Sequence, residues 1–360
     1  MVDIVVIGGG VIGMLTAREL CLAGYQVSII EKGMTGQESS WAGGGIVSPL
    51  FPWRYSDAVN ELARWGQAYY PELITEIEEE TGLGAELVKS GMLFLDDRES
   101  EEAKIWAEKW QASLQVVDRK EIFEIAPNLS SSRLVQDQAI WMPEIRQVRN
   151  PRFVAALKQF LVKQGVKIVE NEEVKDFLVE GNKVSGVVTS SGQINAAKVL
   201  LAGGAWSANL LKKIGFSLSV EPVKGQMLLF KAEPNVVNSI ILSRDRYVIP
   251  RRDGRVLVGS TLEYTDFDKS TSLEAKDALF KEAIDIIPAL EQFEIEHHWA
   301  GLRPGSVDGV PHICAHPELE GLYINTGHFR NGIVLGPASA RLMADIILQR
   351  TTILNPNMYM

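Results

Sequence analysis

The feature that most constrains the fold is a glycine-rich turn near the N-terminus, Gly8-x-Gly10-x-x-Gly13. Residues 4–7 before it are continuously apolar and mostly β-branched, as a parallel strand buried on both faces requires. A helical pattern follows until Gly24, and residues 26–30 predict a second strand that Glu31 closes. Strand, glycine turn, helix and strand in this order predict a nucleotide-binding βαβ unit.

The three glycines have distinct physical roles in such a unit. Gly8 permits the tight turn, Gly10 lets the backbone approach a pyrophosphate, and Gly13 lets the helix pack closely on the strand. The N-terminus of the helix stabilises the phosphate charge. The carboxylate of Glu31 is expected to accept both ribose hydroxyls and to disfavour a 2′-phosphate.

A second cluster of small residues lies at 39–46, directly after this unit. Backbone N–H groups beside an existing pyrophosphate site can contact further phosphate oxygens and the edge of an isoalloxazine. The two clusters together favour FAD over NAD.

The remainder of the chain alternates between two styles of pattern. Helices are expected at 59–82, at 150–165 with Asn150 as the N-cap, and at 337–348. Apolar strands are expected at 166–169, 183–189, 198–202 and 322–325, whereas alternating strands at 226–231, 240–242, 247–250 and 256–260 predict antiparallel sheet. We therefore expect an α/β fold, α+β overall.

The nucleotide-type segments lie at the beginning, middle and end of the chain, which predicts two interleaved domains. Residues 1–85, 148–218 and 298–360 are assigned to a Rossmann-type FAD-binding domain. Residues 86–147 and 219–297 are assigned to a mostly antiparallel-sheet substrate-binding domain.

Charge and cysteine content exclude several classes of partner. The 360 residues include 36 Lys and Arg against 46 Asp and Glu, a net charge of −10 that repels nucleic acid and anionic membranes. Only Cys21 and Cys314 are present, without the paired spacing of a zinc site or a disulfide framework. We expect a cytoplasmic chain that binds no metal, no nucleic acid and no membrane.

With these motifs, the sequence resembles the D-amino acid oxidase superfamily of flavoproteins, and within it the glycine oxidase branch associated with thiamine biosynthesis. The resemblance runs nearly end to end. The segments that carry it are 5–13, 31–32, 202–206, 222–226, 299–305 with 308–311, and 327–333.

Arg303 is the first candidate catalytic residue. It stands in a Gly/Pro-rich stretch with no oppositely charged neighbour until Asp308, which suits a bidentate clamp for an α-carboxylate as well as a structural salt bridge. The resemblance implies that Arg303 binds the substrate carboxylate, that Tyr247 adds a hydroxyl to the same group, and that Arg330 is a second active-site arginine.

The glycine motifs and the resemblance together assign the contacts to FAD. These are Gly8, Gly10, Val11, Ile12, Gly13, Glu31, Lys32, Ser39, Ser40, Gly44, Gly45, Ile46, Val174, Gly203, Trp206, His328, Phe329, Arg330, Asn331, Gly332, Ile333 and Val334. Cys314 lies downstream of the position at which related sarcosine oxidases attach their flavin, so the FAD is expected to be non-covalent.

The reaction implied by the resemblance is oxidative deamination of glycine, sarcosine and small D-amino acids. Hydride passes from the α-carbon to flavin N5 without a side-chain base, and the protein contributes orientation and electrostatics. The imine formed from glycine hydrolyses to glyoxylate and ammonia, or supplies thiazole formation, and oxygen is reduced to hydrogen peroxide. A homo-oligomer, by resemblance a tetramer, is expected.

Three positions depart from the glycine oxidase pattern: Ile46, Leu262 and Asp245. They leave the selectivity for the substrate side chain open. The alternatives are an N-methyl amino acid oxidase, a D-amino acid dehydrogenase that passes electrons to a quinone, a flavoprotein acting on a tRNA base, and a non-enzymatic FAD-binding module.

Overall fold

A computed structural model describes residues 2–134 and 137–360 of the chain. Within these ranges the strands form an eight-stranded sheet, a nine-stranded sheet and a small sheet of β3 (Val88–Lys89) with β7 (Arg146–Gln147). The helices are α1 (Val11–Leu22), α2 (Ser39–Ala42), α3 (Asp57–Thr81), α4 (Ser100–Trp110), α5 (Arg119–Ile125), α6 (Asn150–Lys163), α7 (Ser207–Leu211), α8 (Leu273–Ile286) and α9 (Gly332–Ile347).

The first sheet has the order β18-β19-β11-β1-β2-β8, with β10 paired to β11 and β9 paired to β10. Its core is parallel, because β1 pairs in parallel with both β2 and β11. The strands are β1 (Val2–Ile7), β2 (Val27–Ile30), β8 (Lys167–Val169), β9 (Val174–Glu180), β10 (Lys183–Thr189), β11 (Gly192–Leu201), β18 (His312–Ala315) and β19 (Leu322–Thr326). The predicted βαβ unit, β1-α1-β2, is confirmed.

Strand β1 is buried on both faces, as its unbroken apolar run predicts. Ile4 and Val6 pack into the core shared with α1, α3, α6 and α9, whereas Val5 and Ile7 pack into the core shared with β9, β10 and α7. The alternation follows from the two-residue period of a strand. This sheet is therefore covered by helices on one face and by the β9–β10 hairpin and α7 on the other.

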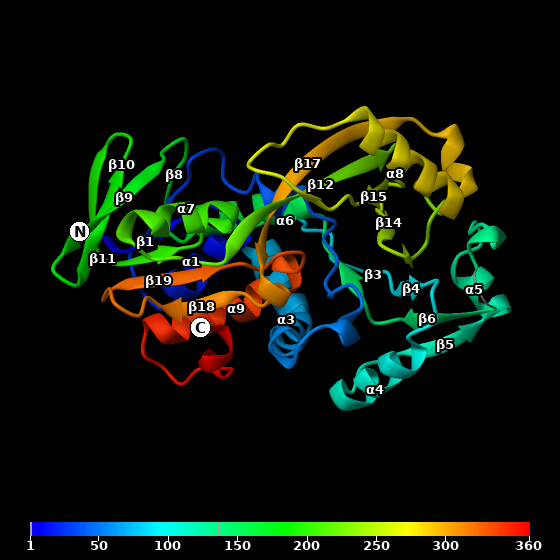
Figure 1. The fold of residues 1–360 in the computed structure, drawn as a ribbon, viewed down its shortest axis with the longest axis horizontal. Helices are drawn as coiled ribbons and strands as arrows, with labels where there is room; N and C mark the ends of the chain where they lie inside the picture. Colours follow the sequence, from blue (N-terminus) through cyan, green and yellow to red (C-terminus); the bar gives the residue numbers. More distant parts are fainter. Residues whose placement is uncertain (1, 135–136) are drawn as a thin grey trace.

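The second sheet has the order β16-β12-β15-β14-β13-β4-β6-β5, with β17 beside β12. Its strands are β4 (Met92–Phe94), β5 (Gln115–Asp118), β6 (Gln138–Met142), β12 (Val220–Phe230), β13 (Ile240–Ser243), β14 (Arg246–Pro250), β15 (Val256–Gly259), β16 (Glu263–Tyr264) and β17 (Ile295–Ser306). Figure 1 shows the long strands β12 and β17 side by side above the middle of the molecule, reaching from the first sheet toward α8.

The mixed α/β class is confirmed, and every predicted strand and helix has its counterpart. The division into two domains at the stated boundaries stays a prediction; β17 begins at Ile295 and pairs throughout with β12. In the described part of the chain, none of the helices is both long enough and apolar enough to cross a membrane.

The prediction that Asn150 caps a helix is wrong. Arg149 occupies the N-cap position of α6, and Asn150 is fully buried inside its first turn. The side-chain amide of Asn150 donates to the carbonyl oxygen of Ser40 at 2.7 Å. The Asn150 side chain therefore contacts the small-residue cluster at 39–46 instead of capping the helix as local rules predict.

Helix α9 begins five residues earlier than expected, at Gly332, so that Pro337 lies inside it. Proline has no N–H, so the carbonyl oxygen of Ile333, four residues before it, loses its helical donor. The buried hydroxyl of Tyr70 on α3 donates to that oxygen at 2.7 Å. The contact between α3 and α9 therefore offsets the cost of an internal proline.

We expect Tyr70→Phe to lower the free energy of unfolding by about 1–2 kcal/mol, because it leaves the partly buried Ile333 carbonyl without this donor. Denaturant titration measures this change. Adding Pro337→Ala restores an N–H to the helix, and the double variant should recover part of the loss. Tyr264→Phe, at an exposed tyrosine, is the control. An equal loss with and without Pro337→Ala would contradict the explanation.

Candidate cofactor and active site

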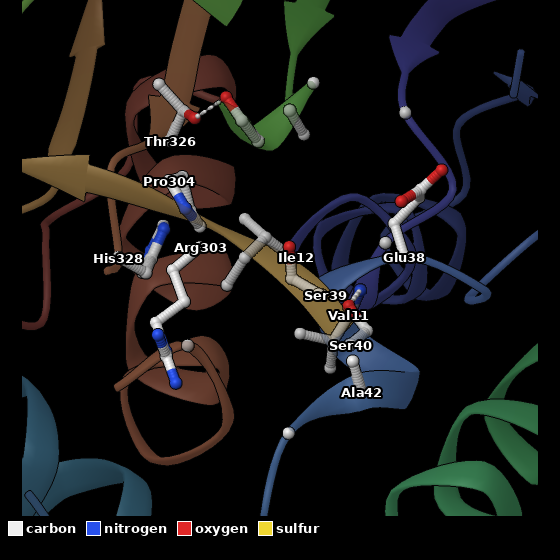
Figure 2. A pocket seen from close by; sticks show the side chains of 18 of the residues that line it. Val11, Ile12, Glu38, Ser39, Ser40, Ala42, Arg303, Pro304, Thr326 and His328 are labelled. Atoms are coloured by element: carbon white, nitrogen blue, oxygen red, sulfur yellow. Dashed lines mark hydrogen bonds between the residues drawn. The ribbon is translucent and has the colours of Figure 1, made fainter. Parts of the chain in front are cut away.

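A continuous cavity of about 350 Å³ lies where the two large sheets meet. The ends of β1, β2, β11 and β19 line it from the first sheet, and β12, β14 and β17 line it from the second. Figure 2 shows Arg303 and His328 on one side of this cavity, and Val11, Ser40 and Glu38 on the other. Ligands of parallel α/β sheets bind beyond the carboxyl ends of the strands in this way.

The glycine turn after β1 has the geometry predicted for it. Gly8 has a φ of +105°, and a Cβ there would collide with the carbonyl of Ala202. A Cβ on Gly13 would collide with the Gly8 carbonyl, which confirms that Gly13 serves close packing. Gly10 lines the cavity at the start of α1, with no side-chain cap of its own. The hydroxyl oxygen of Ser40 accepts from Val11 N at 2.8 Å.

Glu31 lies at the end of β2, against this turn. One carboxylate oxygen accepts from Gly9 N at 2.7 Å and the other from Gly33 N at 2.9 Å. This bracing of the glycine turn was not foreseen from the sequence. A carboxylate has further acceptor sites on both oxygens, so contact with ribose hydroxyls is compatible with it.

Lys32 and Trp206 form part of the same end of the cavity, together with Val174. The Lys32 ammonium lies 2.9 Å from the centroid of the Trp206 ring, a cation–π contact. Burial lowers the pKa of Lys32. The loop after β2 and the turn after β11 are thus joined across the cavity wall.

The second glycine cluster is held by a buried arginine that sequence reasoning missed. Arg251 donates to the Gly44 carbonyl oxygen at 2.9 Å and to Oε1 of Gln147 at 2.6 Å. Burial lowers the pKa of Arg251 to about 10. A Cβ on Gly45 would collide with the Val148 carbonyl, so glycine is required there. This loop carries Gly44 against the ring of Tyr247.

Arg303 stands on β17 at the cavity wall. Nη2 donates to the Ser260 hydroxyl at 2.7 Å, and Nη1 donates to the carbonyls of Lys224 and Thr261, each at 3.3 Å. A Cβ on Gly225 would overlap the guanidinium, so that glycine makes room for it. No carboxylate of the described residues forms an ion pair with Arg303.

The electrostatic setting of Arg303 follows from this burial. Removal from water lowers its pKa, and the nearby charge of Arg330 lowers it further, although Tyr247 acts in the opposite direction. Arginine remains charged despite such shifts. A buried cation held only by neutral acceptors is the arrangement expected of an anion-binding group.

Tyr247 projects from β14 between Gly44 and Gly259. Its hydroxyl has a weak contact with the Met227 sulfur at 3.8 Å. A thioether sulfur is a weak acceptor, so the Tyr247 hydroxyl remains able to donate to a ligand. Tyr247 and Arg303 line the same cavity, so the structure brings the predicted pair together.

The loop between β19 and α9 completes the wall. Phe329 N donates to the Pro304 carbonyl oxygen at 2.9 Å, which ties the loop to β17. His328 is buried, and its Nε2 has no partner among the described residues. Burial and the charge of His312 lower the pKa of His328 to about 3, so the ring is neutral at neutral pH. Arg330 lines the cavity and has no ion pair with a described residue.

Most of the predicted cofactor contacts line this cavity. Three do not: Gly13 packs α1 on β1, Asn331 sits at the N-cap of α9, and Val334 lies in the core. Cavity residues missed from the sequence include Gly225, Met227 and Ser260. Gly225 belongs to a segment that carries the family resemblance, whereas Ser260 has no sequence signal. Of the three departures, Ile46 lines the cavity, and Leu262 and Asp245 do not.

The residues present fit an FAD. The start of α1, whose N-cap residue Gly10 has no side chain, suits a pyrophosphate, and the Glu31 carboxylate suits a ribose. The unpartnered Nε2 of His328 gives a polar contact farther along the same cavity. In the ranges 2–134 and 137–360, no group of three or more His, Cys, Asp or Glu is arranged to hold a metal ion.

Comparison with known proteins agrees with this geometry. A family model described as FAD dependent oxidoreductase (DAO) matches residues 3–346. Glycine oxidase of Pseudomonas aeruginosa is 47% identical over 357 residues, which are 99% of this chain and 97% of that protein. The crystal structure of glycine oxidase from Geobacillus kaustophilus superposes with a TM-score of 0.92 at 31% identity, covering 98% of this chain and 96% of that one.

A longer relative also matches. The bifunctional protein ThiO/ThiG of Trichormus variabilis is 30% identical over 354 residues, which are 97% of this chain and 53% of that protein. The chain is thus similar to about half of that protein and to nearly the whole length of the two glycine oxidases.

The depressed pKa of His328 predicts a pH dependence of stability. The unfolded state binds a proton near pH 6.5 and the folded state only near pH 3, so stability is lost as the pH falls below 6.5. Between about pH 6 and 4, His328→Asn should reduce the slope of unfolding free energy against pH by up to about 1.4 kcal/mol per unit. Denaturant titrations across this range measure it, with the exposed His297→Asn as control. Parallel slopes for wild type and His328→Asn would refute the assignment.

Proposed function

Since the chain belongs to the DAO family of FAD dependent oxidoreductases, we propose that it catalyses the oxidative deamination of glycine with oxygen as electron acceptor. The products are glyoxylate, ammonia and hydrogen peroxide. The observation that carries the proposal is the half-buried guanidinium of Arg303, which faces the cavity without a carboxylate partner among the described residues. The 47% identity to a glycine oxidase over almost the whole chain supports it.

In this proposal Arg303 binds the carboxylate of the amino acid through charge-assisted hydrogen bonds. The Tyr247 hydroxyl donates to the same group, and Arg330 adds a second positive charge beside it. Ser260, Thr261 and Lys224 supply the three neutral acceptors that hold Arg303 in place. A substrate bound in this way has its α-carbon fixed relative to the cofactor, which lowers the entropic part of the barrier.

We assign the cofactor contacts predicted from the sequence to the cavity residues that match them. The start of α1 with Gly10 and Val11 binds the pyrophosphate, and Glu31 binds the ribose. Ser39, Ser40, Gly44, Gly45 and Ile46 approach the flavin from one side, and residues 328–333 from the other. FAD, when bound, supplies the acceptor for the hydride that leaves the substrate α-carbon.

The start of α9 has an electrostatic role in this scheme. Its first turn, at Gly332 and Ile333, lines the cavity. The positive end of a helix stabilises negative charge that develops near it. The early start of α9, five residues before the position expected from the sequence, therefore adds to the binding of an electron-accepting cofactor.

Finer properties follow from the family resemblance. We propose that the FAD is non-covalent, that the protein is a cytoplasmic homo-oligomer, in the first instance a tetramer, and that the imine product supplies thiazole formation in thiamine biosynthesis. Similarity to about half of a bifunctional ThiO/ThiG protein supports the last point. Light scattering of the purified protein measures its mass.

We expect the purified yellow protein to consume oxygen with glycine and to release hydrogen peroxide. The rates with sarcosine, D-alanine and D-proline, each given separately at the same concentration, show how large a substrate the cavity accepts. Bleaching of the flavin by glycine without oxygen uptake would indicate a dehydrogenase with another acceptor. No response to any of the four amines would overturn the proposal.

We expect Arg303→Ala to raise the KM for glycine and to leave the absorption spectrum of bound FAD unchanged. The loss of a buried charge-assisted contact corresponds to about 2–4 kcal/mol in kcat/KM, roughly 30- to 1,000-fold. Steady-state oxygen consumption measures it. Arg119→Ala, at a half-exposed arginine paired with the exposed Asp137, is the control. Equal KM values for Arg303→Ala and wild type would remove Arg303 from the carboxylate site.

A further inference from the structure

Behind Arg303, on the other face of the second sheet, lies a buried lysine that the proposed chemistry does not use. Lys224 on β12 is 6% exposed. Its ammonium lies 3.2 Å from a carboxylate oxygen of Glu263 and 3.2 Å from one of Asp268, and it donates to the Ser270 carbonyl oxygen at 3.2 Å. These three partners belong to β16 and the segment that follows it.

The strand register places this cluster opposite the cavity. In β12, Lys224 pairs with Glu263 of β16, and its neighbour Val223 pairs with Arg303 of β17. Gly225 and Met227 line the cavity, so the two-residue period puts the side chains of Lys224 and Gln226 on the opposite face. Lys224 therefore has no direct contact with a ligand in the cavity.

The cluster is nevertheless linked to Arg303 through one short turn. Ser260 and Thr261, between β15 and β16, provide two of the three acceptors of the Arg303 guanidinium. The hydroxyl of Thr261 donates to Glu263 and accepts from Gln226 N at 2.8 Å. Lys224 thus fixes the Glu263 carboxylate, which accepts from the Thr261 hydroxyl. The carbonyl oxygen of Thr261 in turn accepts from the Arg303 guanidinium.

The third acceptor of Arg303 is the backbone carbonyl of Lys224 itself. All three acceptors therefore depend on how β12 and β16 are held together. Strand β16 is only two residues long and, among the described strands, pairs with β12 alone, so its backbone hydrogen bonds are few. The ion pairs of buried Lys224 with the partly exposed Glu263 and the half-exposed Asp268, together with the hydrogen bond from Gln226 Nε2 to Glu263 at 2.9 Å, are the polar contacts that close this edge of the sheet.

We propose that Lys224 is a positioning residue for Arg303. By fixing Glu263 and Asp268 against β12, it holds the turn at Ser260 and Thr261 and so sets the direction of the guanidinium that binds the substrate carboxylate. The inference rests on the proposed function only in that Arg303 binds a carboxylate. A small displacement of such a group weakens binding even when the cofactor site is intact.

The test is Lys224→Met in the FAD-loaded protein, which removes the ammonium and keeps the length of the side chain. We expect the KM for glycine to rise at least about 10-fold with kcat within about 3-fold of wild type, a loss confined to binding. The Kd for acetate, followed by the perturbation of the flavin absorption spectrum, should rise by the same factor. The FAD content should not change.

Lys269→Met is the matched control. Lys269 lies in the same segment, is about half exposed, and pairs with Glu38 instead of with the cluster. It should leave KM, kcat and the acetate Kd unchanged. A fall in kcat for Lys224→Met with KM and acetate Kd unchanged would overturn the proposal. A positioning role predicts that KM and the acetate Kd rise and that kcat stays nearly the same.

A double variant separates positioning from a general loss of structure. If Lys224 acts through Arg303, Lys224→Met should change the acetate Kd by less than about 2-fold when Arg303→Ala is already present. The full effect of Lys224→Met in that background would overturn the proposal. Should Lys224→Met not fold, Asp268→Asn removes one partner at a half-exposed side chain and should raise KM in the same direction by a smaller factor.

Failure of the proposed function is recognised separately. Wild-type protein that neither oxidises glycine nor binds acetate would refute the function before any variant is made. The positioning role is then decided by a crystal structure of Lys224→Met. We expect the Arg303 guanidinium to leave the Ser260 hydroxyl. An unchanged contact near the present 2.7 Å would overturn the inference.

Discussion

The guanidinium of Arg303 is largely removed from water without a carboxylate partner among the described residues, and much of the structure maintains this state. A cation removed from water is costly unless polar groups replace its hydration. Here a hydroxyl and two backbone carbonyls do so, while Gly225 leaves space where any side chain would overlap the guanidinium. An internal carboxylate would satisfy Arg303 better but would also occupy the position of an anionic ligand. The arrangement thus gives up some stability for an open binding site.

The long pairing of β12 with β17 brings this charge to the nucleotide-type sheet. Residues 220–230 and 295–306 pair along almost their whole length, and the end of β17 is tied to the 327–331 loop because Phe329 N donates to the Pro304 carbonyl oxygen. The cavity is therefore lined by the first βαβ unit and by the second sheet. A rigid antiparallel ladder suits this role because it does not allow the two ends to slide relative to each other.

What could be predicted from the sequence was determined by local rules. The βαβ unit, the reasons for Gly8 and Gly13, and the antiparallel strands follow from periodicity and steric limits within short segments. The errors at Asn150 and at the start of α9 arise where a distant residue changes the local rule. Ser40 engages the Asn150 amide, and Tyr70 supplies the donor that Pro337 removes. Lys224 and Ser260 could not be assigned, because their roles depend on strand pairing alone.

The chain has a net charge of −10, yet the distribution of its charges makes the cavity suitable for an anionic ligand. The overall field repels anions, yet two arginines, Arg303 and Arg330, share one wall of the cavity and raise each other's energy of burial. Two like charges held close together favour any ligand that brings a negative charge between them. Ile46, Leu50 and Met227 line the same cavity and are apolar. In the proposed function the carboxylate therefore determines binding, and these apolar residues determine which substrate side chain is accepted.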